Sequence, residues 1–129
     1  MPTFQSSDHA TRIFTHLFEI LLKDETFTQR MRESSISLHL IQTKPDVELH
    51  VTPDGVEPGA PAQPAAIRLK MSSDTAHDLW LGKLLMPVAV ATGKVRIKGN
   101  VAKVLEFVPL LRPAFDQYPD IARAEGLPV

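Results

Sequence analysis

Three short runs in the middle of the chain alternate between apolar and polar residues, and this alternation constrains the fold more than any other feature. The runs occupy residues 35–42, 47–52 and 66–71. Successive side chains of a strand point to opposite faces, so each run predicts a strand with one buried and one solvated face. A sheet that is solvated on one side is typical of antiparallel pairing. The pattern therefore predicts an antiparallel-rich sheet that is covered on one face.

The first two runs acquire a defined register if residues 43–46 form a four-residue turn. The inward side chains of the two strands then face one another, as a correct register requires. The expected pairs are Gln42 with Val47, Leu40 with Leu49, and Leu38 with Val51. On the solvated face the same register places His39 opposite His50.

An amphipathic helix is predicted before the strands. Apolar residues recur at helical spacing between residues 13 and 22, Asp8 is a suitable N-cap, and the helix should end near Lys23. Residues 25–33 predict a short helical or irregular connector. Residues 53–65 are rich in Pro, Gly and Ala, so we expect them to form a flexible loop.

The segment after the strands carries clear start and stop signals. Asp74 can cap a helix, and residues 84–91 are almost wholly apolar, with Pro87 placed in the first turn of a short helix. Gly93 suits the end of that helix. Residues 94–98 alternate again and predict a further strand.

Asn100 can cap a last long helix, which three prolines then interrupt. Each proline removes a helix hydrogen bond, so we expect a segmented helical tail that stops at Gly126. The prolines are Pro109, Pro113 and Pro119. The order of elements predicts an α+β fold, with a mostly antiparallel sheet of four to five strands and helices packed on one face.

Composition narrows the functional classes. The chain has 129 residues, 43% of them apolar, which suits one globular domain. Its net charge of −1 argues against nucleic acid as the main partner, since phosphate binding needs a basic excess. With no cysteine, disulfides, thiol catalysis and zinc–thiolate sites are excluded. No secretory signal and no membrane span is visible, so we expect a cytoplasmic protein.

Two segments in this order resemble the sterol carrier protein type 2 family of lipid-binding domains. Residues 74–83, DTAHDLWLGK, are similar to the family's capped helix with its closing glycine. Residues 91–100, ATGKVRIKGN, are similar to its glycine–lysine–strand–glycine signature, which precedes a final helix. The resemblance covers residues 8–115 and leaves 116–129 as the helical tail of a single domain, 1–129.

The resemblance implies an internal apolar tunnel that carries a fatty acid, an acyl-CoA or a sterol-like lipid, with no cofactor and no catalysis. The lipid would lie between the apolar face of the sheet and the helices, and Val88→Asp or Leu85→Arg would abolish binding. The expected ligand-binding residues come from the first helix, the segment 80–90 and the last helix. They are Leu17, Phe18, Leu21, Trp80, Leu84, Leu85, Met86, Val88, Val90, Leu105, Val108 and Leu111.

Several residues have a second interpretation. Trp80 fits the core as well as a pocket wall. His39 and His50 are too few for zinc, which needs three or four protein ligands, so a solvated sheet face suits them better than a metal site. No serine lies in a nucleophile elbow, and Asp116 and Tyr118 have no evident partner, so we expect no enzyme.

Five basic residues share the outward face of two predicted strands. This face fits a transient contact with an anionic membrane or an acyl-CoA phosphate, but it also fits a solvated face that protects a sheet edge. The five are Arg68, Lys70, Lys94, Arg96 and Lys98. An alternative to lipid carriage is an interaction or dimerisation module that serves a lipid- or quinone-modifying enzyme. A homodimer would favour this alternative.

Overall fold

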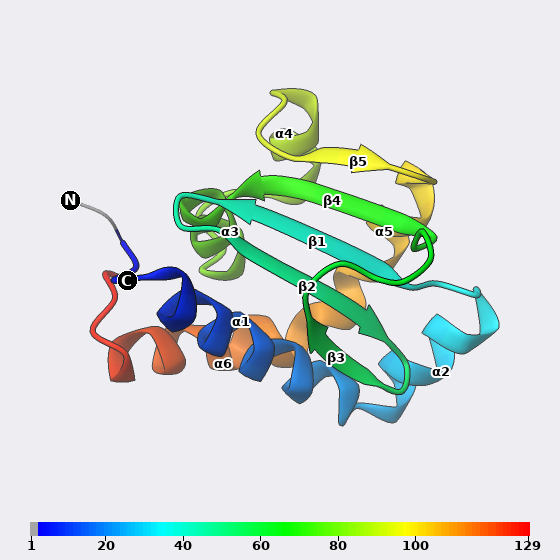
Figure 1. The fold of residues 1–129 in the computed structure, drawn as a ribbon, viewed down its shortest axis with the longest axis horizontal. Helices are drawn as coiled ribbons and strands as arrows, with labels where there is room; N and C mark the ends of the chain where they lie inside the picture. Colours follow the sequence, from blue (N-terminus) through cyan, green and yellow to red (C-terminus); the bar gives the residue numbers. More distant parts are fainter. Residues whose placement is uncertain (1–2) are drawn as a thin grey trace.

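The computed structural model describes residues 3–129 and contains a five-stranded sheet in the order β3-β2-β1-β4-β5 (Figure 1). The central strands β1 and β4 are parallel, and the other three neighbouring pairs are antiparallel. The strands are β1 (Leu38–Thr43), β2 (Val47–Thr52), β3 (Gly55–Pro58), β4 (Ile67–Ser72) and β5 (Arg96–Lys98). The predicted α+β fold with a mostly antiparallel sheet is confirmed.

Helices and one 3₁₀ turn complete the order of elements. They are α1 (Ser7–Leu22), α2 (Glu25–Glu33), α3 (Ser73–Trp80), α4 (Met86–Ala91), α5 (Val101–Phe107), η1 (Val108–Leu111) and α6 (Arg112–Ala124). Burial alternates along the central strand β4, where Ile67 and Leu69 are buried and Arg68 and Lys70 are exposed. One face of the sheet therefore packs on the helices and the other faces solvent, as the alternation predicted. No helix within residues 3–129 is both long and apolar enough to cross a membrane.

The first hairpin has the register that its sequence predicts. Leu38 pairs with Val51, Leu40 with Leu49, and Gln42 with Val47. His39 and His50 are opposite each other on the solvated face. All the inward positions of the hairpin therefore meet beneath the sheet.

Two helix caps differ from expectation, because a serine before each helix takes the capping role. The Ser6 hydroxyl accepts a hydrogen bond from the His9 N–H at 3.1 Å, and the Ser72 hydroxyl accepts one from the Thr75 N–H at 3.0 Å. Asp8 and Asp74, the expected caps, lie inside the first turn of their helices. A carboxylate there interacts favourably with the positive end of the helix dipole. The predicted cap at Asn100 is confirmed.

The expected flexible loop at 53–65 contains the edge strand β3. A tight turn starts it: the Asp54 N–H donates to the Thr52 hydroxyl at 3.2 Å, and Val56 then pairs with Val51. β3 has only four residues, and Val56 is its one inward-facing apolar residue, so the sequence shows no alternating pattern that would predict this strand. At the other end of the sheet, Gly99 has a positive φ of 128°, and a Cβ there would lie 2.7 Å from the Ala66 carbonyl oxygen. Glycine is therefore required where β5 leaves β4.

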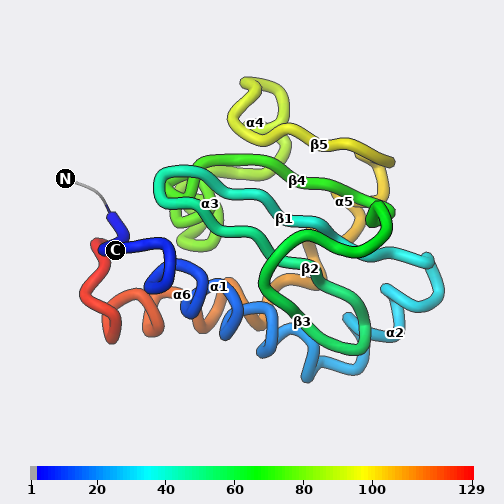
Figure 2. Tube along the Cα trace, viewed as in Figure 1, coloured from blue at the N-terminus to red at the C-terminus, as the bar shows by residue number. Residues whose placement is uncertain are grey.

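The tail is segmented, as its prolines predicted, into α5, η1 and α6, and it ends at Gly126 with φ +76°. Helices α1 and α6 run side by side (Figure 2). Their outer ends are joined by Glu125, whose Oε2 lies 3.0 Å from His9 Nε2 and 2.6 Å from Arg12 Nη2.

Candidate functional site

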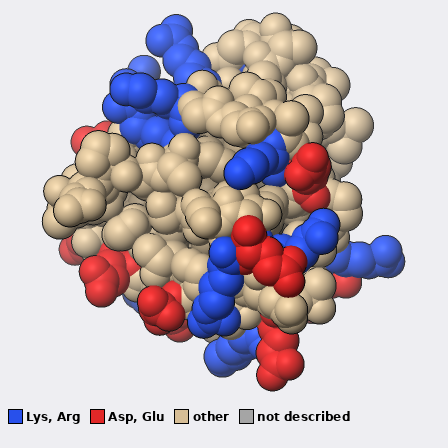
Figure 3. All heavy atoms as spheres, turned by 90° about the vertical axis from the view of Figure 1, so that its right-hand side faces the viewer, with Lys and Arg blue, Asp and Glu red and all other residues tan. Residues whose placement is uncertain are grey.

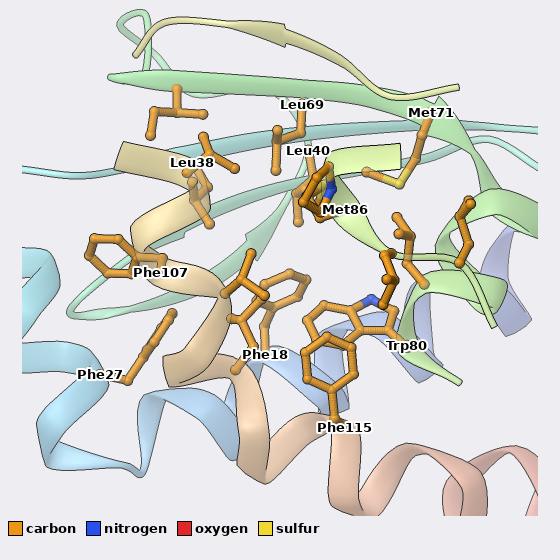
Figure 4. A pocket seen from close by; sticks show the side chains of 18 of the residues that line it. Phe18, Phe27, Leu38, Leu40, Leu69, Met71, Trp80, Met86, Phe107 and Phe115 are labelled. Carbon is orange, nitrogen blue, oxygen red and sulfur yellow. The ribbon is translucent and has the colours of Figure 1, made fainter. Parts of the chain in front are cut away.

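A cavity of about 370 Å³ lies between the apolar face of the sheet and the helices (Figure 4). Strands β1 and β4 supply one wall, and helices and their connections supply the rest. The sheet residues are Leu38, Leu40, Gln42, Ile67, Leu69 and Met71, preceded by Ile36. The other lining residues are Phe18, Phe27, Met31, Leu79, Trp80, Gly82, Leu84, Leu85, Met86, Pro87, Val104, Phe107, Val108, Leu111 and Phe115.

Aromatic side chains form the wall opposite the sheet (Figure 4). Trp80 of α3 meets Phe18 of α1 edge-on at 5.9 Å between ring centroids, and Phe115 of α6 lies 5.2 Å away on a tilted plane. Phe27 of α2 and Phe107 of α5 form a second edge-on pair at 5.9 Å. These spacings are in the favourable range for aromatic pairs. Five helices are thus brought together around one apolar space.

The structure places part of the predicted set in this cavity wall. The seven that line it are Phe18, Trp80, Leu84, Leu85, Met86, Val108 and Leu111. Leu17 and Leu21 are fully buried in the core instead. Val88 is 49% exposed on the outer side of α4, while Val90 and Leu105 are half-buried outside the lining. Helical spacing identifies an apolar stripe, but one stripe serves both the core and the cavity.

Several wall residues were not singled out from the sequence, although signals for them existed. Phe27 and Met31 are four residues apart in α2, which is the spacing of one helix face. The inward residues of the strands were predicted to face the helices, and they form the sheet wall. Phe107 and Phe115 lie on either side of the proline break in the tail, where periodicity is lost.

One polar side chain interrupts the apolar sheet wall. Gln42 is 3% exposed, and its Nε2 lies 3.2 Å from the hydroxyl of Ser73, which is fully buried. The Ser73 hydroxyl in turn donates to the carbonyl oxygen of Pro45 at 2.8 Å. A glutamine at an inward strand position was visible in the predicted register, but no role was assigned to it.

The connection between α3 and α4 leaves apolar side chains at the surface beside the cavity. Leu85 lines the cavity and is nevertheless 65% exposed, and Val88 follows one turn later. Gly82 and Pro87, which also line the cavity, are exposed as well. This connection therefore forms the solvent-facing part of the cavity wall.

The predicted basic surface lies on β4, on β5 and just before β5, which begins at residue 96 rather than at 94 as predicted. It consists of Arg68, Lys70, Lys94, Arg96 and Lys98, all exposed. Arg68 is paired with Lys98 and Lys70 with Arg96, so like charges face each other across the two strands. None of the five forms an ion pair with any residue from 3 to 129. Lys and Arg side chains gather at the upper left of Figure 3, at the height of β4 and β5 in Figure 1, beside an uncharged area.

Two further groups of titratable side chains make contacts within the protein. His39 Nε2 lies 2.7 Å from Glu48 Oε2, and the part of the chain described here holds no group of three or more residues able to bind a metal ion. Tyr118, which had no evident partner in the sequence, contacts His77 in the core. Burial, and secondarily the negative charge of Asp78, raise the pKa of the Tyr118 hydroxyl.

Solved structures share this fold. Sterol carrier protein 2 from Yarrowia lipolytica matches with a TM-score of 0.67 and 19% identity, over 89% of this chain and 98% of that one. The UbiJ-SCP2 ubiquinone synthesis protein matches with a TM-score of 0.57 and 16% identity, over 81% and 94%. Sterol carrier protein 2 from Aedes aegypti, in complex with the C16 fatty acid palmitate, matches with a TM-score of 0.54 and 14% identity, over 75% and 92%.

Sequence comparison identifies a family, and the matching region includes most residues of the cavity wall. Among curated proteins, none matches the chain significantly. The model of the SCP-2 sterol transfer family matches residues 14–112, which include both central strands and most of the cavity wall. The resemblance seen in the sequence is thereby confirmed, and the chain belongs to the SCP-2 sterol transfer family.

Proposed function

We propose that this chain binds one apolar lipid molecule in the cavity beneath the sheet and carries it without changing it chemically. The lining is the observation that supports the proposal most strongly. Among its residues in the described range 3–129, only Gln42 and Trp80 have side chains with N–H or C=O groups. A volume of about 370 Å³ falls within the ~300–1,000 Å³ of small-molecule pockets. Burial contributes about 0.8 kcal/mol per methylene, so ~10 methylenes suffice for useful affinity without a polar motif.

The structure of sterol carrier protein 2 from Aedes aegypti, which shares this fold, was solved in complex with palmitate. This complex supports an acyl chain as one ligand of the cavity. A fatty acid, an acyl-CoA and a sterol-like lipid all present the long apolar body that the cavity suits. A cytoplasmic location stays a prediction from the sequence.

The position of the acid–base groups supports carriage rather than catalysis. His77 and Tyr118 are buried together but do not line the cavity. Both ring nitrogens of His77 lie within hydrogen-bond distance of protein oxygens, Tyr118 Oη and the Pro128 carbonyl. The raised pKa of Tyr118 keeps its hydroxyl protonated at neutral pH. Neither group is therefore placed to exchange a proton with a lipid in the cavity.

The basic surface supports a transient contact with anionic membranes, where a carrier exchanges its lipid. Like charges directly opposite each other in a sheet are destabilising, which favours a partner that neutralises them. The exposed apolar residues Leu85 and Val88 belong to the start of α4, which lies beside the edge strand β5 in Figure 1. Cationic side chains and apolar side chains together match the headgroups and the outer acyl region of a bilayer.

An interaction module is the second candidate. The exposed apolar residues of the α3–α4 connection would then contact a partner protein or a second copy of the chain, rather than a membrane. The shared fold of the UbiJ-SCP2 ubiquinone synthesis protein is compatible with service to a quinone-modifying enzyme.

Fluorescence of Trp80 tests the proposal, because this single tryptophan lies in the cavity wall. Lipid-free protein is titrated with palmitate, and we expect a saturable shift of emission to shorter wavelength that is complete at one equivalent. An unchanged spectrum, together with no retention of radiolabelled palmitate in equilibrium dialysis, would contradict lipid binding. Such a result with a stable dimer in analytical ultracentrifugation would favour the interaction module.

A further inference from the structure

The apolar cavity contains a side-chain hydrogen-bond acceptor that no residue from 3 to 129 satisfies. Gln42 lies in the cavity wall on β1, and its neighbours in register are Val47 of β2 and Met71 of β4. Neither neighbour offers a strong donor or acceptor side chain. Buried polar side chains in folded proteins nearly always have partners, so a glutamine in this position calls for one.

The Ser73 hydroxyl fixes the orientation of the Gln42 amide. A hydroxyl has a single proton, and Ser73 donates it to the Pro45 carbonyl oxygen at 2.8 Å. Its oxygen can therefore only accept from Gln42, which requires Nε2 rather than Oε1 to be the atom 3.2 Å away. The amide oxygen consequently points away from Ser73.

The amide oxygen of Gln42 has no donor among residues 3–129, and it is not sealed in the core. Thr15 Oγ1 is the single fully enclosed side-chain polar atom without a partner in that part of the chain. The Gln42 oxygen must then retain contact with open space. Gln42 keeps only 3% of its accessible surface, and the cavity is the open space that it lines, so we take this space to be the cavity.

The cavity also lacks what an ionised headgroup needs. The lining residues that the structure describes include no Lys, Arg or His, and burying an unpaired carboxylate in apolar surroundings is costly. An ionised carboxylate is in addition an acceptor only, so it cannot satisfy the Gln42 oxygen. A hydroxyl can donate to this oxygen without introducing charge.

We infer that the Gln42 amide oxygen accepts a hydrogen bond from the hydroxyl of a neutral lipid, so that the cavity selects lipid alcohols. This inference rests on the proposed function and narrows its ligand to one class. A fatty acid still binds, but with its carboxylate held outside the cavity and without help from Gln42. Gln42 is then the residue that determines headgroup specificity.

Matched pairs of lipids test this inference on the unmodified protein. Hexadecanol is compared with its methyl ether, and cholesterol with its 3-methyl ether, by displacement of a fluorescent fatty acid. Each ether keeps the apolar body but has no donor. We expect the alcohol of the pair that fits to bind about 10-fold more tightly, since its ether leaves the buried oxygen unsatisfied. The pair that shows the preference identifies the source of the hydroxyl as a linear or a ring lipid.

Gln42→Met then assigns the preference to this residue, because methionine has a similar length and no amide oxygen. We expect the alcohol-to-ether ratio to fall to about 1 in this variant, and its affinity for palmitate, measured alongside, reports whether the cavity is intact. Gln63→Met, in the exposed loop before β4, is the matched control and should keep the full preference.

The outcomes separate this inference from the proposed function. Equal binding of alcohol and ether in both pairs overturns the role of Gln42, while lipid carriage stands. A preference that survives Gln42→Met also overturns it. If no lipid displaces the probe and none binds directly, the proposed function fails together with the inference. If Gln42→Met no longer binds palmitate, the substitution has damaged the cavity. The comparison of alcohols with ethers on the unmodified protein is then the test of the inference.

Discussion

His77 Nδ1 lies 2.7 Å from the hydroxyl of Tyr118, and the two buried side chains join α3 to α6. His77 Nε2 is 2.6 Å from the carbonyl oxygen of Pro128, which can only accept. Nε2 therefore carries the proton in the neutral ring, and the Tyr118 hydroxyl donates to Nδ1. Through one histidine, the last helix and the end of the chain are both held to the core.

Removing the Tyr118 hydroxyl should weaken the fold and leave lipid binding intact. Tyr118→Phe leaves the buried Nδ1 of His77 without a donor, which costs about 1–3 kcal/mol. Urea denaturation measures the loss, and palmitate affinity should not change because Tyr118 is outside the cavity wall. Gln117→Ala, an exposed neighbour on α6, is the control. Unchanged stability in Tyr118→Phe would show that the hydrogen bond contributes nothing.

Filling the cavity should block the lipid. Met86→Trp enlarges a half-buried side chain in the wall, and we expect affinity for a fluorescent fatty acid to fall at least tenfold by loss of space. Val88→Trp is the matched control, two residues along the same helix but outside the lining, and it should bind normally. Equal affinities in the two variants would place the lipid elsewhere.

The same geometry revises the predicted effect of Val88→Asp. Because Val88 does not line the cavity, a carboxylate there stays in solvent and should leave the affinity for free lipid unchanged. Leu85 does line the cavity, so Leu85→Arg keeps its predicted effect.

Reversing one charge of the basic surface should weaken membrane binding and increase the stability of the fold. Lys70 is opposite Arg96, so Lys70→Glu replaces a like-charged pair with an opposite-charged one and should stabilise the fold by about 0.5 kcal/mol. Binding to vesicles that contain phosphatidylserine should weaken about fivefold or more, since each basic residue contributes ~1 kcal/mol.

Lys23→Glu, at the end of α1, is the control for Lys70→Glu and should leave vesicle binding nearly unchanged. Sedimentation with vesicles at low and high salt measures the effect. If Lys70→Glu binds vesicles as tightly as the unmodified protein, the basic surface is not the membrane contact.

Glu125 should make part of the stability dependent on pH. The hydrogen bond from Arg12 lowers the pKa of its carboxyl; partial burial opposes the shift, and His9 adds to the lowering. A lowered folded-state pKa means that the contribution is present above the unfolded value of about 4.3 and is lost as the pH falls through the folded value.

Glu125→Gln should therefore lower the thermal midpoint at pH 7, with a loss below about 1 kcal/mol because Arg12 is largely exposed. At pH 3 the difference between the variant and the unmodified protein should shrink. A difference of the same size at both pH values would mean that the carboxylate charge is not responsible.

The sheet was predictable because its signal is local and repeated. The alternating runs fixed which side chains of β1, β2 and β4 point inward, and the length of the turn fixed the pairing of His39 with His50. β3 was not predictable, since a four-residue strand with one apolar side chain carries too little alternation. The parallel pairing of β1 with β4 depends on a crossover that leaves no mark in either strand.

The cavity was predictable only in outline. Leu17 and Phe18 belong to the same apolar stripe of α1, yet one lies in the core and the other in the wall, because helix packing decides which side faces the open space. Phe115 reaches the cavity through the segmented tail, whose path depends on how three prolines bend it. The role of Gln42 depends on Ser73, which is 31 residues away in sequence.

Native mass spectrometry of the purified protein, followed by extraction of any bound lipid, tests lipid carriage most directly. Lipid carriage predicts a monomer with one additional mass that corresponds to a single lipid, absent after delipidation and restored by one equivalent of added lipid. Met86→Trp should lack this mass, and Val88→Trp should retain it. An unmodified protein that carries no lipid, and takes up none after incubation, would contradict the central claim.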